Sequence, residues 1–349
     1  MESIVEYRNL GGGGCSVSAL ALGTMTFGES TDEEGSFAQL DMFVESGGTL
    51  VDTADVYSAG VSETIIGRWL ADRPREVTDR VVLATKGRFP TGDGPNGVGL
   101  SRRHLDRALT ASLRRLSVDA IDLYQVHAWD PLTPIGETLS FLDDAVRAGK
   151  IRYIGLSNFT AWQVQKTVDL AEFRGLTRPV TLQPQYSLLV REIEWEIVPA
   201  CESTGLGLLP WSPLAGGILT GKYQRDADPA PGTRLTNDRY TPFFAPRTTE
   251  QRTWDVVDTL RSIADQRGAT VSQVALAWVA GRPAVSSVIL GARTLEQLKD
   301  NLGAAELALT DDETERLNQA SHVPVDYPYG GMAVWQRHRE IAGGWPAGR

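Results

Sequence analysis

The sequence predicts a (β/α)8 barrel, the TIM-barrel fold, with an N-terminal β-hairpin and additional helices and loops at the C-terminal face. Short β-branched runs alternate with longer stretches of helical periodicity, which indicates βα units around a parallel sheet. The chain has 349 residues, a length that such barrels reach as one domain. No linker-like or repetitive segment interrupts it, so we expect residues 1–349 to form a single domain.

Eight runs have the length and composition of strands, and each is followed by a segment with helical character. They are residues 19–22, 49–52, 81–85, 122–126, 151–156, 180–185, 207–211 and 285–290. An open doubly wound sheet is the alternative, but it would need a GxGxxG motif after an early strand. The early cluster 11–14 is four consecutive glycines. It is better explained as a hairpin turn that closes the barrel floor.

The helices have readable start signals and apolar stripes. Leucine recurs at every third or fourth position over 105–116, and a second stripe covers 135–146. We expect Thr133 to be the N-cap of this second helix and Pro134 its first residue. Capping-box patterns, in which a threonine precedes Gln or Glu by three residues, begin at Thr160, Thr270, Thr294 and Thr310.

Composition narrows the class of protein. The formal charge of −10 disfavours nonspecific nucleic-acid binding, which needs a basic surface. The N-terminus lacks the features of a signal peptide and no stretch is long enough to span a membrane, so we expect a cytoplasmic protein. Cys15 and Cys201 form neither a CxxC motif nor part of a metal cage. We therefore expect free thiols and no metal.

Four polar residues at strand ends carry the chemistry. Asp52 and Tyr57 follow one apolar run, and Lys86 and His127 follow the next two. The C-terminal ends of barrel strands meet at one face, where catalytic groups belong. An ammonium beside a phenol stabilises the phenolate and makes the phenol a stronger acid. We therefore expect carbonyl reduction in which Tyr57 protonates the developing alkoxide.

Over essentially its whole length the chain resembles the aldo-keto reductases, on the branch near potassium-channel β-subunits and bacterial carbonyl and sugar reductases. The motifs that carry the resemblance are Gly23-Thr24-Met25, Asp52-Thr53-Ala54-Asp55-Val56-Tyr57, Thr85-Lys86, Gln125-Val126-His127, Gly155-Leu156-Ser157-Asn158-Phe159, Gln183, Trp211-Ser212-Pro213-Leu214-Ala215-Gly216-Gly217 and Gly291-Ala292-Arg293 with Gln297 and Asn301. The resemblance implies that Tyr57 is the general acid/base and that Asp52, Lys86 and His127 support it.

The resemblance also implies NADPH as the cofactor. Arg293 would bind the 2′-phosphate, and the helix opened by Thr294 offers an anion site at its N-terminus. Trp211 would stack on the nicotinamide, and Ser157, Asn158 and Gln183 would hydrogen-bond its carboxamide. The full set of implied cofactor residues is Gly23, Thr24, Met25, Asp52, Ser157, Asn158, Gln183, Trp211, Ser212, Leu214, Gly216, Lys222, Arg234, Gly291, Arg293, Gln297 and Asn301.

Substrate specificity is the least determined part of the prediction. Residues expected to wall the pocket are Phe27, Tyr57, Phe89, His127 and Trp129, with Phe244 and Trp335 as further candidates. Segment 212–246 is expected to fold over the cofactor, and the aromatic tail 322–349 to pack partly over a barrel mouth. A small carbonyl compound is the expected substrate, and a keto group on a nucleotide-activated deoxysugar is one hypothesis.

Two other functions remain open. A strand-end lysine in a barrel can attack a carbonyl, so a Schiff-base aldolase acting through Lys86 is conceivable. The dinucleotide-binding motifs argue against it. A regulatory subunit that holds NADPH as a redox sensor, with little turnover, is the second alternative.

Overall fold

A computed structural model describes residues 6–238, 241–325 and 327–331. Its centre is an eight-stranded parallel sheet in the order β10-β3-β4-β5-β6-β7-β8-β9. A parallel bridge between Leu208 and Val285 joins the two edges, so the sheet closes and the predicted barrel is confirmed. The strands are β3 (Leu20–Gly23), β4 (Leu50–Asp52), β5 (Val82–Gly87), β6 (Ile121–Val126), β7 (Ile151–Ser157), β8 (Pro179–Gln183), β9 (Gly207–Leu208) and β10 (Val288–Gly291).

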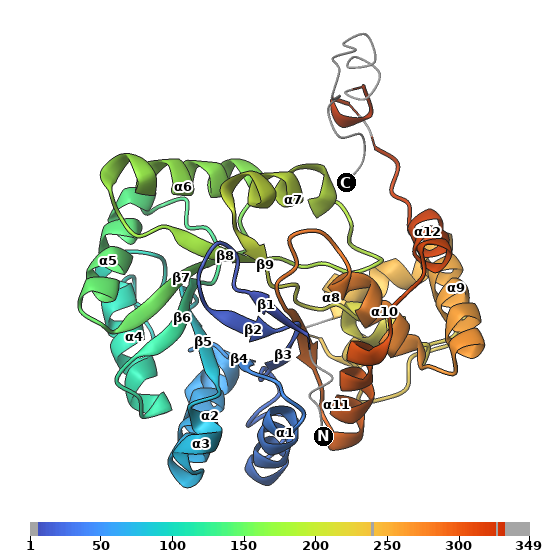
Figure 1. Cartoon of the computed structure of the whole chain (residues 1–349), viewed down its shortest axis with the longest axis horizontal. Coiled ribbons are helices and arrows are strands. Elements are labelled where there is room, and N and C mark those ends of the chain that lie inside the picture. The colour runs from blue at the N-terminus through green and yellow to red at the C-terminus, as the bar shows by residue number, and fades with distance from the viewer. Residues whose placement is uncertain (1–5, 239–240, 326, 332–349) are drawn as a thin grey trace.

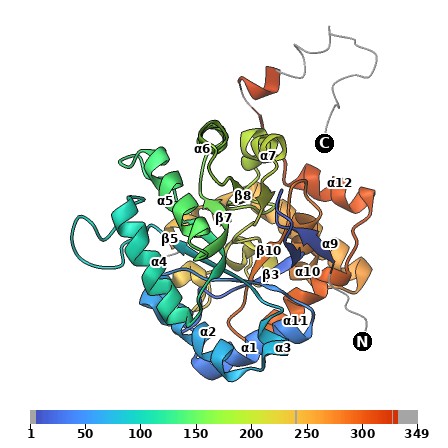
Figure 2. The ribbon, with the colours of Figure 1, turned by 60° about the vertical axis from the view of Figure 1, so that its left-hand side comes forward.

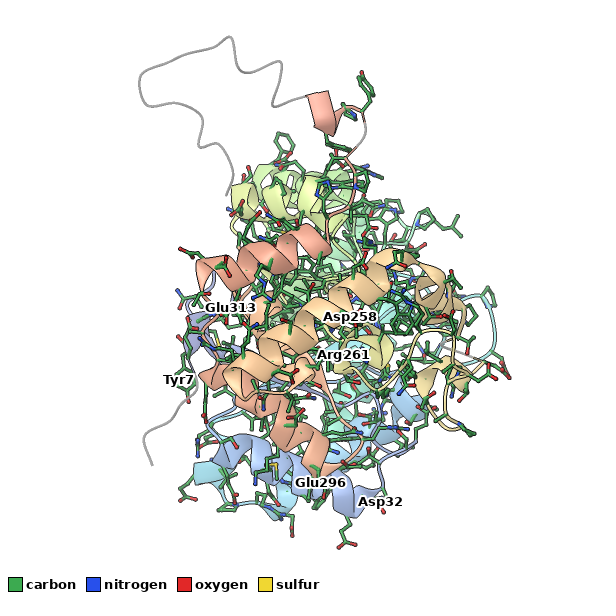
Figure 3. All side chains as sticks on the ribbon, turned by 90° about the vertical axis from the view of Figure 1, so that its right-hand side faces the viewer. Tyr7, Asp32, Asp258, Arg261, Glu296 and Glu313 are labelled. Atoms are coloured by element: carbon green, nitrogen blue, oxygen red, sulfur yellow. The ribbon has the colours of Figure 1, made fainter. Side chains whose placement is uncertain are left out.

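The helices surround this barrel (Figures 1 and 2). Figure 3 views the side on which α9 and α12 lie next to each other, with Asp258 and Arg261 on α9 and Glu313 on α12. None of the described helices is long and apolar enough to cross a membrane. The helices are α1 (Glu33–Glu45), α2 (Val61–Asp72), α3 (Arg75–Thr78), α4 (Arg102–Leu116), α5 (Ile135–Arg147), α6 (Ala161–Arg174), α7 (Ile193–Thr204), α8 (Thr241–Phe244), α9 (Gln251–Arg267), α10 (Val271–Ala280), α11 (Leu295–Leu302) and α12 (Asp311–Ala320).

Three of the four predicted capping boxes are present, those of Thr160, Thr270 and Thr310. The fourth differs, because the Gln297 side chain accepts a hydrogen bond from the Arg293 backbone N–H and not from Thr294. The prediction for α5 was wrong by one position, since Pro134 is its N-cap. Thr133 instead donates its hydroxyl to Asp130, and the cap residue Pro134 makes no side-chain hydrogen bond to the helix.

The glycine cluster forms the predicted hairpin between β1 (Tyr7–Asn9) and β2 (Ser16–Ser18). Gly11 has a φ of +57°, and a Cβ there would lie 1.8 Å from the Val180 carbonyl oxygen. Its N–H donates to the Ser286 hydroxyl. Val180 and Ser286 lie at or just before the starts of β8 and β10, so the hairpin covers the N-terminal end of the barrel. Only glycine allows this close approach.

The described part of segment 212–246 forms short turns of helix: η2 (Ala215–Thr220), η3 (Arg234–Thr236), α8 and the start of η4 (Ala245–Thr249). In the tail, Tyr329 stacks on Trp195 of α7 with ring centroids 5.8 Å apart. Trp335 and Trp345 lie outside the described residues, so the expected packing of the tail over a barrel mouth stays a prediction.

Candidate active site

The four predicted residues occupy the C-terminal face of the barrel. Asp52 ends β4, Lys86 lies near the end of β5, and His127 directly follows β6. Tyr57 begins η1 (Tyr57–Gly60), a turn in which Ser58 has a left-handed φ of +48°. The Ser58 hydroxyl donates to the Phe27 carbonyl at 2.8 Å. This turn brings the phenol back over the strand ends.

Lys86 is the centre of the site and is fully buried. Its Nζ donates to Asp52 Oδ2 at 2.6 Å, to the Thr53 carbonyl at 2.8 Å and to the Tyr57 hydroxyl at 3.2 Å. Burial alone disfavours the ammonium, but the charge of Asp52 and the bonds to Asp52 and Tyr57 together raise the pKa of Lys86. The lysine is therefore a fixed cation that contacts the phenol oxygen.

His127 lies beside this group and is 9% exposed. Its ring meets the Tyr57 ring edge to face, with centroids 6.0 Å apart, and Phe89 packs on it at 4.6 Å. Burial, with smaller contributions from the charges of Lys86 and Arg88, holds the pKa of His127 well below its ordinary value. The imidazole is therefore neutral at neutral pH and can share a hydrogen bond without carrying charge.

Two glutamine side chains hold the remaining oxygen of Asp52. Gln125 and Gln183 donate to Oδ1 at 3.0 and 2.9 Å, and Gln183 also donates to the Gln125 carbonyl oxygen. In the sequence analysis Gln125 appeared only within a motif, and no role was predicted for it. Here it is a buried partner of Asp52. Gln183, expected to bind the cofactor carboxamide, uses its N–H groups within this network.

Ser157, Asn158 and Trp211 are brought together beside His127. The Asn158 amide donates to the His127 carbonyl at 2.9 Å and accepts from the Trp211 indole at 3.1 Å. The Ser157 hydroxyl donates to the Gln183 carbonyl. Asn158 has a φ of +54°, which an asparagine tolerates better than most residues. The predicted nicotinamide contacts therefore share one hydrogen-bonded group.

A second group of predicted residues forms a cluster of cations near the end of β10. Arg293 donates to the Gly232 carbonyl at 2.8 Å, and this bond holds segment 212–246 against the C-terminal end of β10. The Arg234 guanidinium lies near Gly291, with its Nη2 atom 3.9 Å from the position that a Cβ on Gly291 would occupy. Burial and the charges of Arg293 and Arg234 lower the pKa of Lys222. Neighbouring cations repel one another, so such a cluster suits the phosphates of a dinucleotide.

The other predicted cofactor residues line or support this region. Thr24 is fully buried and donates to the Asp52 carbonyl, so its side chain fastens a strand end. A Cβ on Gly23 would meet Ile289 at 2.6 Å, and one on Gly216 would meet the Phe244 ring at 2.7 Å. Asn301 donates to the Gly291 carbonyl. Met25, Ser212, Leu214 and Gln297 lie on the same loops and on α11.

The residues of the predicted substrate wall differ in exposure. Phe27 has no exposed surface, so it packs in the core and does not face a pocket. Phe89 and Trp129 remain partly exposed. Trp129 meets Phe159 and Trp162 edge to face. Phe244 is also buried, against Gly216; Trp335 lies outside the described residues.

The sequence reasoning missed a buried polar cluster behind Lys86. Glu63 is fully buried, accepts from Thr85 at 2.6 Å and pairs with Arg115 at 2.6 Å. Asp55 is 3% exposed. Burial and the neighbouring Glu63 raise its pKa to about 7, and the charges of Arg115 and Lys86 and the Val56 N–H offset this only in part. Asp55 stood within the quoted motif, but spacing could not show which way it points.

Comparison with known proteins identifies the family of this chain. The model of the aldo/keto reductase family matches residues 19–322. The "Uncharacterized oxidoreductase YrpG" of Bacillus subtilis is 41% identical over 322 residues, covering 90% of this chain and 95% of that protein. The "Probable voltage-gated potassium channel subunit beta" of Oryza sativa is 37% identical, covering 87% and 92%. The "Versiconal hemiacetal acetate reductase" of Aspergillus parasiticus is 32% identical, covering 90% and 96%.

The match spans most of the chain, and the strand-end residues that suggested the resemblance lie together at one face of the barrel. The chain therefore belongs to the aldo/keto reductase family and is an oxidoreductase that acts on carbonyl or alcohol groups.

Proposed function

We propose that the protein reduces an aldehyde or ketone to an alcohol with NADPH, and that Tyr57 is the general acid. The observation that carries this proposal is the buried contact of the Lys86 ammonium with both Asp52 and the Tyr57 hydroxyl. A reduced nicotinamide supplies hydride to the carbonyl carbon. The protein must then supply a proton to the oxygen, and the Tyr57 hydroxyl lies at the face where substrate would enter.

Each residue has a distinct part in this proton transfer. Tyr57 donates its proton to the substrate oxygen, and the Lys86 ammonium stabilises the phenolate that remains. Asp52 keeps Lys86 charged and in place, and is itself held by Gln125 and Gln183. The neutral imidazole of His127 donates a hydrogen bond to the same substrate oxygen and so orients the carbonyl.

Preference for NADPH over NADH would come from the cation cluster. Burial lowers the pKa of Lys222, and the guanidiniums of Arg293 and Arg234 lie close enough to lower it further. An additional phosphate on the adenosine would relieve that repulsion and accept charge-assisted hydrogen bonds from Arg293. Trp211 would stack on the nicotinamide, while Ser157 and Asn158 would bind its carboxamide.

The decisive experiment compares the wild type with Tyr57→Phe. NADPH oxidation is followed with a panel of aldehydes and ketones, and NADPH binding is measured by fluorescence. We expect Tyr57→Phe to bind NADPH normally and to lose about 100-fold or more in kcat, the range for a lost general acid. Full activity in Tyr57→Phe would refute the mechanism.

A redox-sensing subunit is the alternative that a relative supports, because one similar protein is named as a potassium channel β-subunit. Tight NADPH binding with near-zero turnover across the carbonyl panel would favour it. The Schiff-base aldolase is disfavoured because Lys86 is fully buried and hydrogen-bonded to three oxygens. Trapping of substrate on Lys86 by borohydride would reinstate it.

For the substrate, we propose as one specific case a keto group on a nucleotide-activated deoxysugar, bound near Phe89 and Trp129. Kinetics with such a sugar beside simple aldehydes test this, and no preference for the sugar would refute it. We also propose a cytoplasmic location, since Cys15 and Cys201 are both free thiols.

A further inference from the structure

Arg88 is a cation at the active-site face that the proposed mechanism does not use. It follows β5 directly, two residues after Lys86. Its φ is +153°, in a region that favours glycine, and its carbonyl accepts from the Gly99 N–H at 2.9 Å. Backbone strain of this kind concentrates at functional sites, where surrounding contacts maintain it.

The Arg88 side chain lies next to the reaction centre. Its guanidinium carbon is 5.0 Å from the centre of the Phe89 ring, and that ring is 4.6 Å from the His127 ring. The charge of Arg88 reaches far enough to contribute to the lowered pKa of His127, after burial and Lys86. An anion held by Arg88 would therefore lie within a small molecule's length of Tyr57 and His127.

Most of the hydrogen-bonding capacity of this guanidinium is unused. Its one hydrogen bond to the described residues is long, 3.4 Å to the Trp129 carbonyl, and its buried Nε has no partner among them. A guanidinium has five N–H donors arranged to bind a carboxylate or phosphate with two of them. Arg88 thus has donors to offer a ligand.

The nearest carboxylate does not neutralise Arg88. Burial acts to raise the pKa of Asp130, but its hydrogen bonds and the charge of Arg88 outweigh burial and lower it. No ion pair joins Asp130 to Arg88 within the described part of the chain. The oxygens of Asp130 already accept from the N–H groups of Leu100 and Leu132 and from the Thr133 hydroxyl. Asp130 therefore holds the loops around Arg88 and leaves the guanidinium available.

We propose that Arg88 binds an anionic group of the substrate, a carboxylate or a phosphate, while the carbonyl lies against Tyr57 and His127. The preferred substrates are then carbonyl compounds that carry a negative charge a few bonds from the reacting carbon. This inference rests on the proposed carbonyl reduction, and it assigns the substrate class for that site. A solely structural Arg88 would pack on Phe89 without selecting charge.

Two pairs of substrates test the proposal. For a carboxylate, 4-carboxybenzaldehyde is compared with its methyl ester; for a phosphate, glyceraldehyde 3-phosphate is compared with glyceraldehyde. In each pair we expect the wild type to favour the anion in kcat/KM, less strongly as salt is raised. If the anion is preferred in only one of the two pairs, that pair identifies the kind of anion that Arg88 binds. No preference in either pair would overturn the proposal.

The variant Arg88→Gln shows whether Arg88 causes the preference. We expect the ratio of kcat/KM between anion and neutral partner to fall about 10- to 100-fold, the range for one charged hydrogen-bonded contact. Arg88→Lys should recover part of the ratio, and Arg103→Gln, at an exposed position on α4, should not change it. An unchanged ratio in Arg88→Gln would show that Arg88 does not select charge.

A binding measurement separates this proposal from the reduction itself. The alcohol 4-(hydroxymethyl)benzoate is the product of 4-carboxybenzaldehyde reduction, so its binding can be measured without turnover. Binding is followed by the fluorescence of tryptophans, including Trp129. We expect its Kd to rise about 10-fold or more in Arg88→Gln. If no aldehyde is reduced but this anion binds through Arg88, the proposed function fails and the anion site stands. Equal Kd values in both proteins refute the site.

Discussion

Replacing Asp55 with asparagine should make the stability of the protein less dependent on pH. Asp55 is 3% exposed and faces charged or titratable groups from each neighbouring element: Glu63 on α2, Lys86 on β5, Arg115 on α4 and Tyr124 on β6. Burial and Glu63 raise its pKa from 3.8 to about 7. The carboxyl group therefore keeps its proton in the folded protein at pH values where the unfolded chain has lost it.

The sign follows from this difference in bound protons. Between the unfolded and folded pKa values the native state binds one more proton at Asp55, so stability falls as pH rises. At about 1.4 kcal/mol per pKa unit, the shift costs roughly 4 kcal/mol once both states are ionised, and about 2 kcal/mol of this is lost between about pH 5 and 7. Below the unfolded pKa, Asp55 is protonated in both the folded and the unfolded protein, so it causes no loss of stability. Asparagine does not titrate, so Asp55→Asn lacks this loss.

Thermal unfolding at several pH values measures the effect. For a chain of this length about 2 kcal/mol corresponds to roughly 3 °C in Tm. The Tm of Asp55→Asn minus that of the wild type should therefore increase by about 3 °C between about pH 5 and 7. Asp265→Asn, at an exposed position on α9, is the control. A difference that stays constant or decreases with pH would refute the buried, protonated carboxyl.

Three further outcomes are expected. Gly11→Ala should lower stability by about 3 kcal/mol, because its Cβ would meet the Val180 carbonyl at 1.8 Å; Gly14→Ala, with nothing near its Cβ, is the matched control in thermal unfolding. The pH profile of kcat should lack an acid limb from His127 near its ordinary pKa, since burial lowers that value; a limb that disappears in His127→Gln would contradict this. Arg293→Ala should raise the Kd for NADPH about 10-fold or more and change that for NADH little; equal changes, measured by fluorescence, would show that Arg293 does not read the 2′-phosphate.

Local patterns were sufficient to predict the barrel and to place the four candidate catalytic residues at the ends of its strands. Alternation of the two hydrophobic periods located eight strands, although some of their ends shifted by up to three residues. The largest shifts are in β9, which ends at Leu208 and not at Trp211, and in β10, which begins at Val288 and not at Val285. Pro210 lacks the N–H that a continuing strand needs, and Trp211 forms only an isolated bridge with Gln185.

Side-chain direction was the part that sequence could not supply. Phe27 was expected to wall the substrate pocket, yet it lies in the core. Thr24 was expected at the cofactor, yet its hydroxyl binds the Asp52 carbonyl. Both residues stand on loops, where no periodicity tells which side faces inward. Their positions depend on contacts distant in sequence, since Ser58 donates to the Phe27 carbonyl and Ser62 to the Thr24 carbonyl.

The sequence by itself determined the fold class, the family and the four residues at the strand ends. It could do so because the order of strands and their terminal residues are properties of the linear chain. Only the tertiary structure decided what surrounds those residues. It placed Gln125 against Asp52 and the Asp55–Glu63 cluster behind Lys86, and it left Arg88 with unused donors beside His127. The physical reason is that pKa values and substrate contacts depend on burial and on neighbours that are distant in sequence.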